Sequence, residues 1–190
     1  MALAEHTAGP ERAPARHVHA RKATPQPFAP QISARRSYAL HKILDRNPVW
    51  ERVAAVLERY RPAYAAFTAT EDHSKETLYG CRMCGQCALP ITGYACPMTC
   101  PKQLRNGPCG GVGENGACEV YPEQRCVWVI AYERAEANGH ADDLMLLQRP
   151  VDRRKFGQSS WVNFWAGRDE YLADAPKAHR GLVRPVEPAE

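Results

Sequence analysis

The chain has 190 residues, a formal net charge of +4 and 44% hydrophobic residues. The length suits one domain of ordinary size with tails, and the mild charge gives no support for a protein that binds nucleic acid or anionic membranes through charge. No stretch approaches the roughly 18 consecutive apolar residues of a membrane-spanning helix, and the N-terminus lacks the apolar core of a secretory signal. The sequence therefore predicts a cytoplasmic protein with no nucleic-acid or membrane partner.

The N-terminal segment, residues 1–32, is rich in Ala, Pro, His and Arg and has almost no bulky apolar side chains. Such a segment cannot bury enough apolar surface to offset the entropy lost on ordering it. We therefore expect residues 1–32 to form a disordered basic arm, with ordered structure beginning near residue 33.

Residues 33–72 are expected to be helical. Near the start, three apolar residues are spaced for one helical face: Leu40, Ile43 and Leu44. Asn47 and Pro48 are the residue types of an N-cap and a first helical position, which predicts a new helix there. Its apolar residues recur at helical spacing from Val49 to Tyr60, as in an amphipathic helix packed on a core or a partner. Pro62 is expected to end or kink it.

The pattern changes between residues 81 and 126, where helical periodicity vanishes. This segment holds eight cysteines, seven glycines and five prolines in 46 residues, and the chain has no cysteine elsewhere. The cysteines are Cys81, Cys84, Cys87, Cys96, Cys100, Cys109, Cys118 and Cys126. The segment has little hydrophobic material of its own, and metal–thiolate bonds can hold such a loop together.

Two further helices are expected after the cysteines. One begins after Cys126 and closes at Gly139, and a short capped helix is predicted in SSWVNFWAGRDEY, from residue 159. We assign residues 73–172 to a cysteine-rich metal-binding domain with flanking helices and residues 173–190 to an irregular tail. No segment alternates polar and apolar residues for long. The predicted fold is therefore mainly α, a small domain of helices and loops with a cysteine-rich irregular metal-binding segment and little β.

The cysteines could serve four purposes, and two are disfavoured by the rest of the sequence. Disulfides are rare in the reducing compartment predicted here. A catalytic cysteine needs a base nearby, and the chain has no histidine between His73 and His140. What remains is metal, as structural zinc or as iron–sulfur clusters.

Iron–sulfur and zinc both take four thiolates per site, so eight cysteines would fill two sites. The run C-x2-C-x2-C, at Cys81, Cys84 and Cys87, can wrap three ligands around a four-iron cluster. The later C-x3-C-P, ending at Cys100 and Pro101, matches the end of the ferredoxin run, although eight residues intervene here. Zinc sites more often use two C-x2-C pairs. The spacing favours two [4Fe–4S] clusters and leaves zinc as the alternative.

These motifs resemble one particular family. The run CGQCALPITGYACPMTCPKQLRNGPCGG, followed by GACEVYPEQRCVWVIAYERA, is similar to the C-terminal domain of certain methylenetetrahydrofolate reductases, a domain that also occurs as a separate small subunit of the MetV type. The later SSWVNFWAGRDE is similar to that family's tail element. The resemblance spans residues 75 to 172, and the long N-terminal arm departs from a minimal member of the family.

The resemblance implies a role in one-carbon, tetrahydrofolate metabolism. In such systems a flavin-containing TIM-barrel subunit reduces methylenetetrahydrofolate or runs in reverse, and the small subunit beside it carries metal or clusters. The family's cysteine pattern carries onto all eight cysteines of this chain, while no folate-binding or flavin-binding residue carries over. FMN or FAD is therefore expected on the partner, and no catalytic residue is expected on this chain, which is too short to add a barrel of about 250 residues.

Two functions follow as hypotheses. In the first, the chain is an electron-transfer subunit whose two [4Fe–4S] clusters relay electrons between the partner's flavin and a further electron-transfer protein. In the second, two Zn²⁺ ions hold the loop together, and the chain is a structural or assembly subunit of the same reductase with no redox role.

Overall fold

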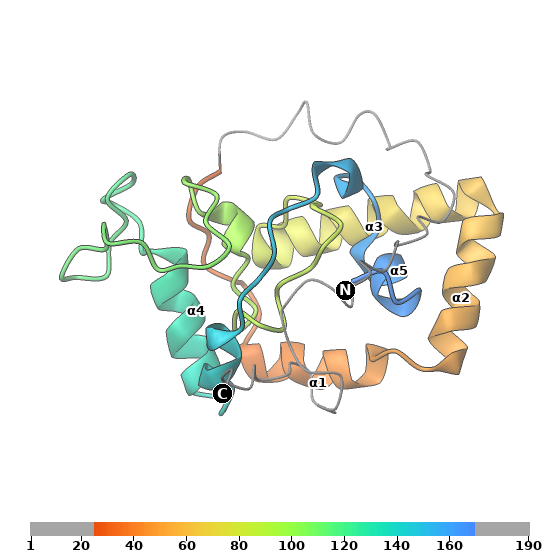
Figure 1. Ribbon diagram of the computed structural model, residues 1–190, viewed down its shortest axis with the longest axis horizontal. Coiled ribbons are helices and arrows are strands. Elements are labelled where there is room, and N and C mark those ends of the chain that lie inside the picture. Colours follow the sequence, from red (N-terminus) through yellow and green to blue (C-terminus); the bar gives the residue numbers. More distant parts are fainter. Residues whose placement is uncertain (1–24, 170–190) are drawn as a thin grey trace, which may run out of the picture.

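The computed structural model describes residues 25–169. Five α-helices lie in this part of the chain: α1 (Ala34–Leu44), α2 (Pro48–Arg59), α3 (Arg61–Tyr79), α4 (Val127–Glu136) and α5 (Ser160–Trp165). In Figure 1, α1, α2 and α3 form three sides of an open frame, with α5 inside it and α4 beyond its far end. The predictions for the tail, and for all but the last eight residues of the arm, lie outside the described residues.

The cysteine segment crosses the space between α3 and α4 without regular strands. Two isolated β bridges lie in this segment, Val112 with Cys118 and Ala117 with Arg125. Three short 3-10 turns complete the elements: η2 (Pro97–Thr99), η3 (Ala141–Met145) and η4 (Arg153–Lys155). The prediction of a mainly helical protein with an irregular cysteine-rich segment and little β is confirmed.

Helices α1 and α2 begin with side-chain caps. The Asn47 side chain accepts hydrogen bonds from the backbone N–H groups of Val49 and Trp50, and Pro48 is the first helical residue, as predicted. Of the three apolar residues expected on one face of α1, Leu40 and Ile43 are exposed, and only Leu44 packs against a hydrophobic cluster. Ile43 is 68% exposed, and the buried residues of α1 are Ala34, Ser37, Tyr38 and His41.

Helix α3 is longer than the sequence indicated. Helix α2 ends at Arg59, shortly before Pro62, as predicted, and Pro62 lies in the first turn of α3, where no intrahelical N–H is needed. The helix runs for 19 residues and ends at Gly80, whose φ of 65° is the left-handed cap conformation. Its buried face is largely polar (Thr68, Glu71, Lys75 and Tyr79), so apolar periodicity could not reveal it. The boundary expected between residues 72 and 73 falls inside α3.

Three hydrophobic clusters hold the structure together. The first joins α1 and the end of α3 to the cysteine loop through Tyr38, Tyr79 and Tyr94. The second packs α4 on Cys100 and Cys126. The third joins α2, α3 and α5, with the Trp50 and Trp165 rings stacked 4.6 Å apart. The cysteine loop therefore has helices packed against it on both sides.

The predicted helices after the cysteines are present. Helix α4 follows Cys126, and α5 begins after Ser159, whose hydroxyl accepts a hydrogen bond from the Val162 N–H. None of the helices between residues 25 and 169 combines the length and apolar character that a bilayer crossing requires.

Candidate metal centre

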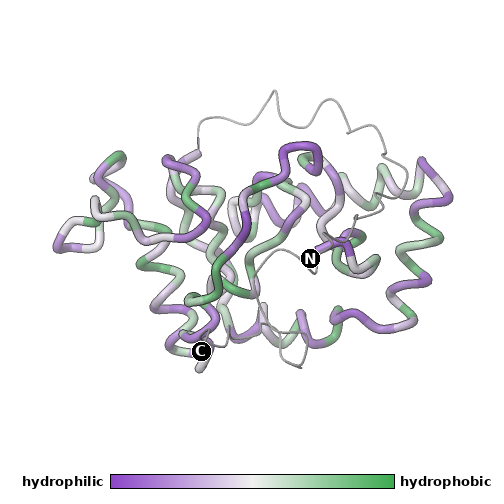
Figure 2. The backbone as a smooth tube through the Cα atoms, in the orientation of Figure 1, coloured by the Kyte–Doolittle hydropathy of each residue, from purple (hydrophilic) through white to green (hydrophobic). Residues whose placement is uncertain are grey.

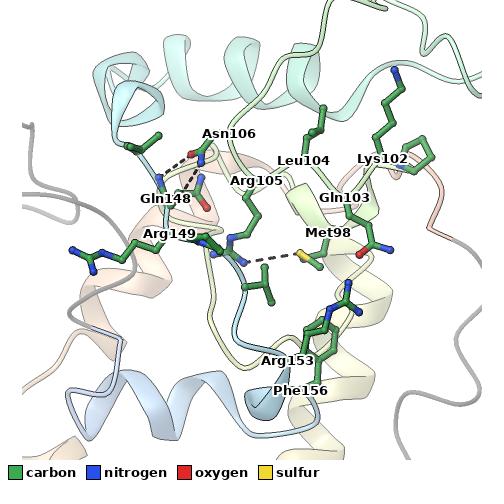
Figure 3. Close-up of a pocket in the computed structure, with 14 residues that line it drawn as sticks. Met98, Lys102, Gln103, Leu104, Arg105, Asn106, Gln148, Arg149, Arg153 and Phe156 are labelled. Atoms are coloured by element: carbon green, nitrogen blue, oxygen red, sulfur yellow. Dashed lines mark hydrogen bonds between the residues drawn. The ribbon is translucent and has the colours of Figure 1, made fainter. Parts of the chain in front are cut away.

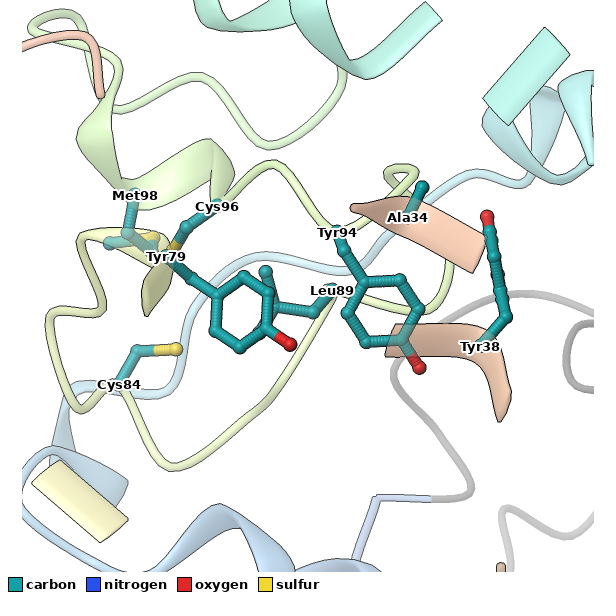
Figure 4. Close-up of a cluster of buried hydrophobic side chains, with 8 residues drawn as sticks. All are labelled: Ala34, Tyr38, Tyr79, Cys84, Leu89, Tyr94, Cys96 and Met98. Atoms are coloured by element: carbon teal, nitrogen blue, oxygen red, sulfur yellow. The ribbon is translucent and has the colours of Figure 1, made fainter. Parts of the chain in front are cut away.

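Four of the eight cysteines line one small cavity. Cys81, Cys84, Cys87 and Cys96 surround it together with Met83, Met98, Arg105 and Ser160. Cys81 follows directly on the C-terminal glycine of α3, and Cys96 immediately precedes η2. Figure 4 shows Cys84 and Cys96 on neighbouring parts of the loop, beside Met98 and Tyr79. The sequence groups the first three cysteines, and the fold adds Cys96 as the fourth.

The backbone around these cysteines donates hydrogen bonds to their sulfur atoms. The Met83 N–H lies 3.3 Å from Cys81 Sγ, the Leu89 N–H donates to Cys87, and the Met98 N–H donates to Cys96. In each case the donor is two residues after the cysteine. Such N–H donors stabilise sulfur in its thiolate form, so the loop is prepared for three charged sulfur atoms.

A second segment, residues 152–163, fixes the loop from the other side. The Gln86 side chain donates to the Asp152 carbonyl and accepts from the Asp152 N–H, at 2.8 and 3.0 Å. Asn163 donates to the Gly85 carbonyl at 2.9 Å. Gly85 has a φ of 70°, and a Cβ there would lie 2.2 Å from the Lys155 carbonyl oxygen, so only glycine fits. The cysteine loop is therefore held in one conformation by protein contacts.

A buried cation stands on the α3 side of the cavity. Lys75 is 6% exposed, and its Nζ donates to Glu71 and to Ser160, each at 2.7 Å. It also lies 4.5 Å from the ring centre of Trp161. Burial opposes its charge, but the charges of Glu71 and of the thiolates of Cys87 and Cys81 raise the pKa of Lys75 above its ordinary value.

A second cation, Arg105, closes the opposite side. It is 7% exposed, with Nη2 donating to the Gln86 carbonyl at 3.1 Å and Nη1 pointing at Cys84 Sγ from 3.9 Å. Its charge also lowers the pKa of Cys96, although less than burial raises it. The four thiols therefore lie between two positive groups, which is the charge arrangement that thiolates require in a buried site.

The protein by itself favours the protonated form of Cys81, Cys87 and Cys96. Burial raises the pKa of Cys96 to about 12, and burial together with the neighbouring Cys96 thiolate raises the pKa of Cys81 well above its usual range. Burial also raises the pKa of Cys87, with Lys75 acting in the opposite direction. Thiolates would form here when a bound metal supplies further positive charge and displaces the protons.

The other four cysteines are less closely associated. Cys100 and Cys126 pack in the same hydrophobic cluster under α4. Cys109 and Cys118 belong to the irregular segment between η2 and α4, part of which projects at the left of Figure 1, and Cys109 Sγ is 3.9 Å from Glu119 Oε1. The backbone N–H of Cys126 bonds to the Gly116 carbonyl of that segment. The structure thus places Cys100 and Cys126 in one hydrophobic cluster and Cys109 and Cys118 on one loop.

The residues present fit a thiolate-ligated metal group at the first site. Its donor set is four sulfur atoms around one cavity, with N–H donors, two cations and a glycine-dependent close contact. Within residues 25–169, no three His, Cys, Asp or Glu side chains stand close enough to hold a single ion as the chain is arranged. The four cysteines are therefore assigned to one site because they line the same cavity, and not because their sulfur atoms already meet at one point.

Sequence patterns did not reveal the supporting residues Glu71, Lys75, Gln86 and Arg105. The four-residue spacing of Glu71 and Lys75 on a helix was an available signal, since such pairs share one face. No local signal relates Arg105 or Gln86 to the cavity, because their contacts depend on how distant segments fold together.

Fold and site together define a small helical protein built around a cysteine-rich loop. Comparison with protein families matches residues 61–154 to the family described as methylene-tetrahydrofolate reductase C terminal. That segment, which contains all eight cysteines, therefore belongs to this family, as the motif resemblance predicted. The match links the chain to methylenetetrahydrofolate reductase. Comparison with curated proteins and with solved structures found no match.

Proposed function

We propose that this protein is an accessory subunit of a flavin-dependent methylenetetrahydrofolate reductase. In this proposal it carries two [4Fe–4S] clusters and relays electrons to or from the flavin of a barrel-shaped partner subunit. The supporting observation is the cavity lined by Cys81, Cys84, Cys87 and Cys96, with sulfur-directed N–H groups on three of them. The family match supports the link to the reductase.

We favour a cluster over a single ion at this cavity. Four-iron clusters take one thiolate at each iron, so their ligands surround a volume rather than a point. The C-x2-C-x2-C run supplies three such ligands locally, and Cys96 supplies the fourth from the next turn. When bound, the cluster would supply one-electron transfer at a potential set by hydrogen bonds, charge and burial.

The chain's own residues would control that potential and the stability of the site. The N–H groups of Met83, Leu89 and Met98 would stabilise negative charge on sulfur, and so would the cations Arg105 and Lys75. Both effects favour the more negative, reduced form of a cluster. Burial disfavours the extra negative charge of the reduced cluster. The reduction potential would therefore depend on the balance between burial on one side and the N–H donors and cations on the other.

The second set, Cys100, Cys109, Cys118 and Cys126, is proposed to hold the second cluster. Cys100 and Cys126 already share one hydrophobic cluster. Cys109 and Cys118 lie in the irregular segment between η2 and α4, which would need to fold back to complete the site.

Metal analysis of anaerobically purified protein tests the proposal. A brown protein with about eight irons and eight acid-labile sulfides per chain is expected. Cys96→Ser should remove about half of the iron, and Cys118→Ser should remove the other half. A colourless protein with stoichiometric zinc would overturn the electron-transfer function and leave the zinc-stabilised assembly subunit.

A further inference from the structure

A groove lies beside the cysteine cavity and is not used by the proposed function. It has a volume of about 970 Å³, within the range of small-molecule sites, and runs between residues 98–106 and residues 147–156. Figure 3 shows Lys102 and Leu104 toward one end, Arg153 and Phe156 at another, and Arg105 with Met98 between them. Arg105 and Met98 also line the cysteine cavity, so the two spaces share these side chains.

The groove is lined by positive charge. Lys102, Arg105, Arg149 and Arg153 line it, and none of its lining residues within the described chain is acidic. Lys102 forms an ion pair with Glu119, whereas the exposed Arg153 reaches the groove from η4. Several cations facing one concave surface create a field that attracts anions, and arginine matches phosphate geometry closely.

Two buried polar atoms beside the groove have no hydrogen-bond partner in the described chain. They are Nε of Arg105 and Oε1 of Gln148, on side chains that are 7% and 4% exposed. Buried polar groups are nearly always paired, and an unpaired group costs free energy. One of these atoms is a donor and the other an acceptor, and both are screened from solvent, so they belong to the wall of the groove and not to its open surface.

The remaining lining is apolar or amide in character. Leu104, Leu147, Val151 and Phe156 provide apolar surface, and the side chains of Gln103 and Asn106 provide amides. Asn106 also ties the two sides together, because its side chain donates to the Gln148 carbonyl and accepts from the Gln148 N–H at 2.7 and 2.8 Å. This reciprocal pair keeps the sides of the groove at a fixed separation.

We propose that this groove binds a small nucleotide. Phosphates match the cations, sugar hydroxyls and base edges match the amides, and the face of a base matches the apolar side chains around Phe156. A concave site of this size, with a few polar groups fixed in place, favours a small ligand over an extended acidic segment of a partner protein. The proposal does not depend on the metal at the cysteine cavity.

A nucleotide in the groove would affect the cysteine cavity through Arg105, whose side chain lines both spaces. The guanidinium group lies between the two spaces, with Nη1 directed at Cys84 Sγ and Met98 Sδ. A phosphate near Arg105 would offset part of the positive charge that faces the thiols. Ligand binding and the chemistry of the cysteine cavity would therefore be coupled through this side chain.

Fluorescence anisotropy with N-methylanthraniloyl-ADP tests the proposal on the full chain. We expect saturable binding to the unaltered protein that weakens as salt is raised. Arg153→Glu should weaken it by about tenfold or more, since a charge-assisted contact becomes repulsive. Arg52→Glu is the matched control, because Arg52 is an exposed residue of α2 and the change in net charge is the same. It should alter the affinity by less than about twofold.

The outcomes are distinguishable. Absence of saturable binding, or equal losses in the two variants, would overturn the site. A fluorescein-labelled hexaglutamate peptide that binds more tightly than the nucleotide, with the same dependence on Arg153, would replace the nucleotide with an acidic protein segment. Circular dichroism checks that the variants fold, and metal content measured on the same samples tests the subunit proposal separately.

Discussion

Lys75 is a charged side chain in a position that is almost inaccessible to water, and its partner Glu71 is buried beside it. Glu71 also accepts hydrogen bonds from the hydroxyls of Ser159 and Ser160 on the cap and first turn of α5. The pair thus connects α3 to α5 directly behind the cysteine loop. Removing one partner leaves an uncompensated buried charge, which costs more than the pair itself contributes.

Lys75→Met should therefore destabilise the protein by about 3 to 5 kcal/mol. The double variant Glu71→Gln with Lys75→Met should recover a large part of that loss, because no buried charge remains. Urea unfolding measures both. Arg125→Met, which breaks the exposed pair with Glu133, is the control and should change stability by less than about 1 kcal/mol. Equal effects of Lys75→Met and Arg125→Met would contradict this account.

His41 is a buried histidine among aromatic rings, with Phe164 and Trp161 at centroid distances of 5.5 and 6.3 Å. Burial lowers its pKa to about 4, with Asp45 acting in the opposite direction. The unfolded chain therefore binds this proton more strongly than the folded protein does. The contribution to stability is fully present above about pH 6.5 and is lost as the pH falls toward 4.

The free energy of unfolding should thus decrease by up to about 3 kcal/mol from this residue between pH 7 and 4. His41→Phe should flatten that part of the pH profile, measured by urea unfolding at a series of pH values. His73→Phe, on the exposed side of α3, should keep the original slope. If the His41→Phe variant loses as much unfolding free energy between pH 7 and 4 as the unaltered protein does, His41 is not the cause of the acid sensitivity.

At the scale of elements, α2 carries an apolar stripe that the fold leaves uncovered. Polar and apolar residues alternate along this helix at the edge of the molecule (Figure 2). Three residues of the stripe are each more than half exposed: Val49 in the first turn of α2, Val56 in its last turn and Tyr60 at its C-cap. Ile43 of α1 is 68% exposed. The proposed function requires a surface that meets the reductase subunit, and exposed apolar patches of this kind mark interaction sites.

Val56→Asp should consequently reduce co-purification with a co-expressed flavin-dependent reductase by about tenfold. The residue is exposed, so stability should change by less than about 1 kcal/mol. Val120→Asp, at an exposed apolar residue in the irregular segment between η2 and α4, serves as the control and should leave assembly intact. Loss of assembly in both variants would show that this stripe is not the specific contact.

The elements differed in how far the sequence revealed them. Caps and prolines located the starts of α2 and α5, because Asn47 and Ser159 act on backbone groups within three residues. The length of α3 could not be read from apolar periodicity, since its buried face includes Glu71 and Lys75. The inward face of α1 was also missed, because Tyr38 and His41 are buried by distant segments while Ile43 is left exposed.

At the scale of the whole molecule, two kinds of packing coexist. The α2, α3 and α5 cluster is held by stacked tryptophans and apolar side chains, whereas the loop from Cys81 to Cys126 combines apolar contacts with side-chain hydrogen bonds to residues 152–163. If metal occupies the cysteines of this loop, its removal should loosen the loop and leave the helical cluster folded.

Anaerobic chelation followed by limited proteolysis measures this difference. New cleavage sites should arise within residues 81–126, with α2 and α3 protected. Metal-loaded protein is the control and should resist cleavage in the loop. An unchanged cleavage pattern after verified metal loss would mean that protein contacts alone hold the segment.

The sequence by itself determined the helical class, the positions of the caps, the cysteine-rich segment and the family to which residues 61–154 belong. These features depend on residue types at short, fixed spacings, which act locally. Only the tertiary structure brought Cys96 to the cavity of Cys81, Cys84 and Cys87, placed Lys75 and Arg105 on either side of it, and formed the cationic groove next to it. These arrangements depend on contacts between segments far apart in the chain, such as Gln86 with Asp152 and Lys75 with Ser160, and no local pattern encodes them.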